Sequence, residues 1–179
     1  MHQGTVLDAT EEEWNLAFAL NVRAMWKAMQ AALPAMLGAL LLSAGFEDVR
    51  VREIANWKNA AVAMLAPFWW WANGWGLWPD AAVQLGMAAV VLVLFFGAFQ
   101  LGMMGGGDVK LIAALALWFP FPAFAQLLVV MSLAGGLVTL ALLIERRLKG
   151  REVEVPYGVA IAIAGLVALE PIFNQASHT

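Results

Sequence analysis

The sequence contains no cysteine and only two histidines, and both histidines lie close to its ends, at positions 2 and 178. Without cysteine there is no disulfide framework, no thiol nucleophile and no cysteine-based zinc site. A histidine-ligated metal or a histidine general base inside the fold is not expected either. Any catalysis would therefore fall to carboxylates, hydroxyls or lysines, and we expect no cofactor and no metal.

Charge is also scarce, since only 13% of the 179 residues are charged whereas 63% are hydrophobic. A soluble domain carries charge on about a quarter of its residues. The mean hydropathy is +0.76, and this apolar excess must face lipid. The sequence predicts an all-α, polytopic membrane protein with membrane lipid as a partner. The net charge of -3 gives no reason to expect nucleic acid.

Long uncharged runs mark the expected membrane crossings. One spanning helix needs about 20 apolar residues. The "FPFP" sequence at residues 119–122 divides the longest run, because proline removes backbone donors and favours a turn. We therefore expect six transmembrane helices, of which the fourth and the sixth are short. The runs are Ala28–Phe46, Asn59–Pro79, Ala81–Gly107, Leu111–Ile144 and Val155–Leu169.

The basic residues predict how these helices are oriented. From Asp48 onward, every basic residue follows the first, third or fifth expected span: Arg50, Arg52, Lys58, Lys110, Arg146, Arg147, Lys149 and Arg151. Positive charge favours the cytoplasmic side, so these three loops should be cytoplasmic. The tryptophan-rich segment "PFWWWANGWGLWP" then ends the second span at the opposite face, as an interfacial aromatic belt.

Two aspartates should lie at the cytoplasmic face: Asp48 directly after the first span, and Asp108 after three glycines at the end of the third. If they converge, they cannot both ionise easily, and one keeps a proton. Such a pair can hold a water and act as base and acid toward a scissile carbonyl. Asp48 could instead be an ordinary interfacial acid, with Glu47 as a competing candidate. An acid flanked by glycines in a membrane protein, as at Asp108, is a functional candidate by default.

The segment "GGGDVKLIAALALW" resembles the GxGD motif of the aspartic prepilin peptidases, also called type IV leader peptidases. Gly105, Gly107 and Asp108 occupy the motif positions, and Lys110 is also typical of the family. From the residues alone, Lys110 could tune Asp108 or could serve only to anchor the helix that it begins.

A second and a third motif follow the same family in the correct order. "DVRVREIAN" resembles the family's first aspartate site: Asp48, Ile54 and Asn56 match, whereas Ala55 replaces the usual proline. "VPYGVAIAIAGL", at residues 155–166, resembles the signature of the last span, where Tyr157 and Gly158 either line the site or pack. The resemblance covers roughly residues 36–171.

The resemblance implies an endopeptidase of the bacterial inner membrane that cleaves the leader of type IV pilin precursors at the cytoplasmic face. It implies that Asp48 and Asp108 are the catalytic pair. The chain looks like the short, protease-only type that serves Flp or tight-adherence pili, without the methyltransferase segment and the cysteine-rich loop of longer members. The peptidase domain would span residues 36–173, followed by a short tail at 174–179.

Residues 1–35 differ in kind from the rest. Thr10 and Glu13 form a capping box that predicts a soluble amphipathic helix, loosely docked. The segment resembles part of the short-chain dehydrogenase/reductases, around the helix whose conserved asparagine would be Asn21. That family's glycine-rich turn and Tyr-Lys pair are absent, so no oxidoreductase activity is implied. We interpret it as a fusion of unrelated segments, joined near residues 33–37.

Two other functions remain open from the sequence. The chain could be an inactive membrane protein or an assembly subunit that keeps the peptidase fold, particularly if the fusion shortens the first span. It could also be a small transporter in which Asp108 is a proton or cation site in a glycine-broken helix. Converging aspartates favour the peptidase, and widely separated ones favour the alternatives.

Overall fold

The computed structural model describes residues 10–149 and 157–176, and within them it contains helices and no strand. The all-α expectation is confirmed. The elements in chain order are α1 (Glu11–Val51), α2 (Asn56–Ala72), a single π-helical turn η2 (Leu77–Ala81), α3 (Ala82–Gln100), α4 (Gly106–Ala116), α5 (Phe121–Lys149) and α6 (Tyr157–Ala176).

Four segments of the described residues are long and apolar enough to cross a membrane: Glu11–Val51, Leu77–Gln100, Phe121–Ile144 and Tyr157–Asn174. The chain is a polytopic membrane protein. Helices α2 and α4 fall below that length, so the predicted second crossing is shorter than its uncharged run. The fourth is short, as expected, whereas α6, with 20 residues, is longer than the short sixth crossing that the sequence predicted. The "FPFP" sequence separates α4 from α5, also as expected.

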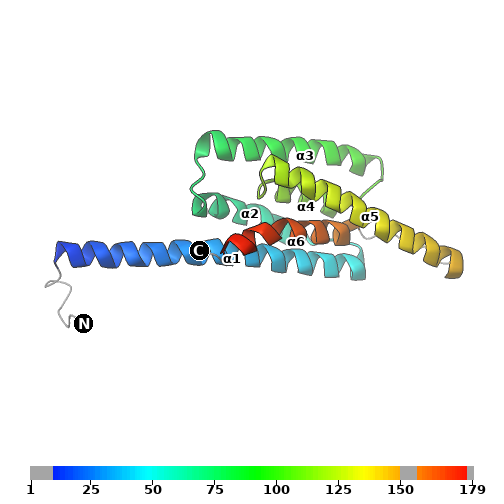
Figure 1. Ribbon diagram of the computed structural model, residues 1–179. Coiled ribbons are helices and arrows are strands. Elements are labelled where there is room, and N and C mark those ends of the chain that lie inside the picture. Colours follow the sequence, from blue (N-terminus) through cyan, green and yellow to red (C-terminus); the bar gives the residue numbers. More distant parts are fainter. Residues whose placement is uncertain (1–9, 150–156, 177–179) are drawn as a thin grey trace.

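The helices form a bundle in which α1 and α6 lie side by side, α3 lies on the opposite side, and α2 and α4 lie between them (Figure 1). Helices α1, α3 and α5 all end toward the same end of the bundle, the right-hand end in Figure 1. This is the arrangement that the basic residues predict. Arg151, in the expected loop before the last span, lies outside the described residues.

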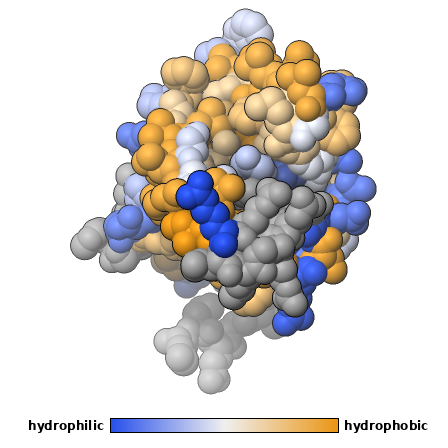
Figure 2. Space-filling model, turned by 90° about the vertical axis from the view of Figure 1, so that its right-hand side faces the viewer, coloured by the Kyte–Doolittle hydropathy of each residue, from blue (hydrophilic) through white to orange (hydrophobic). Residues whose placement is uncertain are grey.

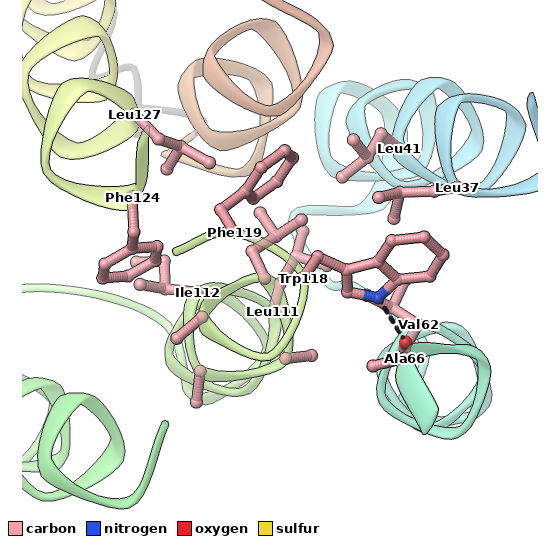
Figure 3. Close-up of a cluster of buried hydrophobic side chains, with 14 of the residues drawn as sticks. Leu37, Leu41, Val62, Ala66, Leu111, Ile112, Trp118, Phe119, Phe124 and Leu127 are labelled. Atoms are coloured by element: carbon pink, nitrogen blue, oxygen red, sulfur yellow. Dashed lines mark hydrogen bonds between the residues drawn. The ribbon is translucent and has the colours of Figure 1, made fainter. Parts of the chain in front are cut away.

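Helix α4 lies at the centre of the core and is buried on nearly every side. Leu111, Ile112 and Leu115 are fully buried, and α4 contacts α2, α3, α5 and α6. Just beyond its end, the Trp118 indole N–H donates to the Val62 carbonyl of α2 at 2.8 Å (Figure 3). Because four neighbouring helices pack against α4, the position of its first turn along the bundle is fixed.

The expectation of a purely interfacial tryptophan belt is wrong for two tryptophans. Trp69 and Trp70 are buried against the core, whereas Trp71 and Trp78 are exposed. The Trp70 indole N–H donates to a backbone carbonyl, that of Leu117, at 2.7 Å. A buried indole needs such a partner, and the end of α4 supplies it. Trp69 and Trp70 therefore lie on the face of α2 that packs against the core, and Trp71 lies on the face that points outward.

Helix α1 is one continuous helix, which corrects the expectation of a separate N-terminal helix. The predicted capping box is confirmed: Thr10 Oγ1 accepts from Glu13 N at 3.2 Å, and Glu13 Oε2 accepts from Thr10 N at 2.9 Å. The first half of α1 projects beyond the bundle (Figure 1), and burial along the helix begins at Leu33. A fusion of unrelated segments near residues 33–37 is compatible with this continuous helix, because a helix can run through such a join without a break in the backbone.

Candidate active site

Asp48 of α1 and Asp108 of α4 line the same pocket, which has a volume of about 430 Å³. The two residues are only 5% and 7% exposed, and their carboxylates interact electrostatically. The pocket lies at the end of the bundle where α1 and α3 end, and hydrophilic side chains gather among apolar ones on that end (Figure 2). Two carboxylates held this far from water cannot both ionise cheaply.

Asp48 lies in the last turn of α1 rather than after the span, because the helix continues to Val51. The backbone N–H of Arg52 donates to the Asp48 carbonyl at 3.1 Å, and Arg52 then turns the chain with a left-handed φ of 58°. A non-glycine residue rarely adopts this conformation. The helix thus ends immediately after Asp48 has been placed in the bundle.

The Asp48 carboxylate lies against the first turn of α6, beside the backbone N–H groups of Gly158 and Val159. The positive end of the helix dipole faces it there. A Cβ at Gly158 would lie 2.8 Å from the Asp48 Cγ, so only glycine leaves room for this contact. The Asp48 Oδ2 is buried and has no hydrogen-bond partner among the described residues.

Asp108 lies in the first turn of α4, not at the end of the third span as the sequence suggested. Helix α3 ends at Gln100, and Gly105 is the residue that caps α4. The Gly105 N–H donates to the Asp108 Oδ2 at 3.3 Å, so the carboxylate helps to begin its own helix. A Cβ at Gly107 would lie 3.2 Å from the carbonyl oxygen of Ile54, which explains a glycine at the helix start.

Polar contacts join the start of α2 to the start of α4. Lys110 Nζ donates to Asn56 Oδ1 at 2.7 Å, and Asn59 Nδ2 donates to the Gly107 carbonyl at 3.1 Å. Lys110 therefore does more than anchor a helix, since it links two elements that line the pocket. Both Asn56 and Lys110 lie at the pocket, together with Gly105, Gly107 and Ile54.

Glu47, which the sequence left as a competitor of Asp48, does not line this pocket. Its Oε2 forms an ion pair with Lys58 Nζ at 2.9 Å and accepts the Ala55 N–H at 3.0 Å. Lys58 Nζ also donates to the Ser43 carbonyl at 3.0 Å. These bonds hold the turn between α1 and α2, so Glu47 has a structural role there.

Tyr157 lies beside the site but not in it, and it lines a separate groove with residues of α3 and α5. Sequence reasoning missed Arg52 and Glu53 as pocket residues. It also missed Asn59, which does not line this pocket but donates to the carbonyl of Gly107, which does. A signal for Asn59 existed, because a polar residue three positions after Asn56 falls on the same side of a helix. Among the described residues, no group of three or more acidic or histidine side chains could hold a metal ion.

The sequence pattern of the type IV leader peptidase family matches residues 35–140, which include both aspartates and more than half of the chain. The chain belongs to the type IV leader peptidase family. In this family member the two aspartates come from elements far apart in the sequence, and the fold brings them into one pocket.

Curated relatives of this leader peptidase family member include the prepilin leader peptidase/N-methyltransferases of Aeromonas hydrophila and of Aeromonas salmonicida strain A449. Each is 34% identical over 94 residues, which are 50% of this chain and 32% of the relative. The match thus spans about a third of the length of these relatives. Comparison with solved structures gives no match.

Proposed function

We propose that the chain is an aspartic endopeptidase that cleaves the leader peptide of type IV prepilins. The observation that carries the proposal is the meeting of two nearly buried carboxylates, Asp48 and Asp108, in one pocket. Membership of the type IV leader peptidase family supports the substrate class. Two far-apart acids would have favoured a transporter instead.

In the proposed reaction the two aspartates share one proton and hold a water between them. The ionised carboxylate takes a proton from the water, whose oxygen attacks the scissile carbonyl carbon. The protonated carboxyl gives its proton to the carbonyl oxygen, so a neutral gem-diol forms. Collapse of this intermediate breaks the C–N bond, and a proton passes to the leaving amine. The pair then returns to its starting state of one shared proton.

The surroundings of the pair suit this chemistry. The Gly105 N–H fixes the Asp108 carboxylate, and Gly158 lets the Asp48 carboxylate lie against the start of α6. The Asp48 Oδ2 is buried and has no hydrogen-bond partner among the described residues, so the fold itself leaves this acceptor unsatisfied. Both acids are therefore positioned before substrate arrives, which lowers the entropic cost of the reaction.

The pocket lies at the end of the bundle to which α1 and α3 lead (Figure 1). Arg52 and Lys110 line it, and Arg50 lies in the last turn of α1. The positive-inside rule favours a cytoplasmic location for this end. We therefore propose cleavage at the cytoplasmic face of a bacterial inner membrane. The proposed substrates are Flp-like prepilins, the class served by the branch of the family that the chain resembles.

The test is cleavage of a co-expressed Flp-type prepilin in membranes by the chain and by its Asp48→Asn and Asp108→Asn variants. We expect the chain to shorten the prepilin, and each variant to lose this activity by at least about a hundredfold. Asp80→Asn is the matched control, because Asp80 lies in η2, away from the pocket. Cleavage that survives in both pocket variants contradicts the mechanism, and no cleavage by any form supports an inactive protein of this fold.

A further inference from the structure

A second cavity, with a volume of about 520 Å³, opens directly beside the aspartate pocket. Helix α4 forms its floor, and α2 and α3 form its walls. Its lining is mostly apolar and includes leucines such as Leu92, together with six alanines: Ala60, Ala63, Ala88, Ala89, Ala113 and Ala114. We call it the alanine groove. Its volume suits a row of side chains from one face of a bound helix or strand, rather than a whole helix.

The alanine groove lies next to the aspartate pocket. Asn56 and Lys110 line both cavities, and the hydrogen bond between their side chains lies between the two. The comparable groove between α3 and α5, which contains Tyr157, shares no lining residue with the aspartate pocket. A chain that lies in the alanine groove therefore ends beside the pocket that holds the two carboxylates, at Asn56 and Lys110.

The fold leaves one hydrogen-bond acceptor unused beside the alanine groove. Asn59 lines the groove and is 4% exposed, and its buried Oδ1 has no hydrogen-bond partner among the described residues. Its Nδ2 donates to the Gly107 carbonyl, which can only accept, and this bond fixes the orientation of the amide. An unpaired acceptor at this depth is costly. A backbone N–H of a bound peptide would satisfy it, whereas a lipid acyl chain has no donor to offer.

We propose that the alanine groove, because its lining is apolar, binds an apolar segment of the peptide substrate, with Asn59 Oδ1 accepting a backbone N–H near the scissile bond. This inference rests on the proposed peptidase function and names where its substrate lies. The apolar segment enters from the lipid between α2 and α3 and follows α4 toward Asn56 and Lys110. The part of the substrate that carries the scissile bond then lies at the aspartate pocket.

Cysteine cross-linking tests the location, since the chain has no cysteine of its own. Leu92→Cys places a thiol in the groove, and Val93→Cys, one residue further along α3 and 71% exposed, places one outside it. Leu140→Cys marks the groove of α3 and α5. Each is made with Asp108→Asn and oxidised in membranes with Flp-type prepilins that carry one cysteine in the apolar segment.

We expect Leu92→Cys to form at least about five times more cross-linked product than Val93→Cys, at prepilin positions three or four residues apart. Equal yields from the two α3 variants would overturn the proposal. A higher yield from Leu140→Cys would place the substrate in the groove between α3 and α5. No cross-linked product from any variant would also overturn the proposal, because the alanine groove would then contact lipid rather than substrate.

A second experiment fills the groove. Ala89→Trp projects an indole into it, and Val90→Trp adds the same side chain to a neighbouring residue that does not line it. We expect Ala89→Trp to raise the KM for full-length prepilin at least about tenfold with little change in kcat, and Val90→Trp to change KM less than about twofold. A short leader peptide without the apolar segment should be cleaved equally by both variants.

The outcomes separate this proposal from the proposed function. If the unmodified chain cleaves prepilin and Ala89→Trp leaves KM unchanged, the docking site is wrong and the peptidase function stands. If the unmodified chain cleaves neither prepilin nor the short peptide, the peptidase function fails, and the docking proposal falls with it.

Discussion

Replacement of Gly158 by alanine should displace the Asp48 carboxylate. The added Cβ would lie 2.8 Å from Asp48 Cγ and 2.9 Å from Asp48 Cβ. Carbon atoms in contact prefer about 3.5 Å, so the gap must open by roughly 0.7 Å. A new rotamer can move Cγ, but Cβ is fixed to the backbone of α1. The first turn of α6 must therefore shift away from α1.

Overpacking of this kind costs about 1–3 kcal/mol of stability. A misplacement near 1 Å can reduce the rate about a hundredfold. We expect Gly158→Ala to fold, to melt at a lower temperature in detergent, and to lose at least tenfold in kcat/KM for prepilin cleavage. Thermal unfolding and a cleavage assay on the same purified sample would measure both effects.

Gly136→Ala is the matched control, because Gly136 also lies inside an apolar helix and its added Cβ would meet no atom within 4 Å. Alanine should stabilise that helix by up to about 1 kcal/mol and leave cleavage unchanged. If Gly158→Ala cleaved prepilin at the normal rate, the contact between Asp48 and α6 would not position the carboxylate, and the reasoning would be refuted.

Three further predictions concern stability, each measured by thermal unfolding in detergent. Trp118→Phe removes the bond to the Val62 carbonyl and should cost about 1–2 kcal/mol; an unchanged melting temperature would contradict this. Ala55 has a φ of -58°, which proline also adopts, so Ala55→Pro should add about 0.4–1 kcal/mol of stability by restricting the unfolded chain. The same change removes the hydrogen bond from the Ala55 N–H to Glu47, which is worth about 1.5–3 kcal/mol. We expect net destabilisation, and a higher melting temperature would show that chain entropy dominates. Deletion of residues 1–25, which are exposed wherever the structure describes them, should change stability by less than about 0.5 kcal/mol; a large drop would show that this part of α1 supports the bundle.

The sequence predicted the two aspartates because charge is rare in this chain and stands out against apolar runs. It placed both wrongly relative to the helices. The glycines before Asp108 seemed to end the third span, whereas Gly105 caps α4. Asp48 seemed to follow a span, although α1 continues to Val51. Uncharged runs locate the apolar part of a helix, but the helix ends are set by capping and backbone turns.

The sequence could not show whether Glu47 or Asp48 is the acid that lines the pocket with Asp108. Neighbouring residues on a helix point about 100° apart, so only one of them can face it. Only the packing of α1 shows that Glu47 faces Lys58 while Asp48 faces the pocket. The burial of Trp69 and Trp70 was hidden for a similar reason. The burial of these two side chains depends on where α4 packs, and the sequence of α2 alone does not predict that position.

The most direct test of the central claim is whether Asp48 and Asp108 act as one unit. Single-turnover cleavage of a Flp-type prepilin would be measured for Asp48→Asn, for Asp108→Asn and for the double variant. Groups that share one catalytic step are strongly non-additive. If the two aspartates act as one unit, each single variant loses nearly all activity and the double variant is no slower than either. Independent losses that multiply in the double variant, or a single variant that keeps most of its rate, would contradict the central claim.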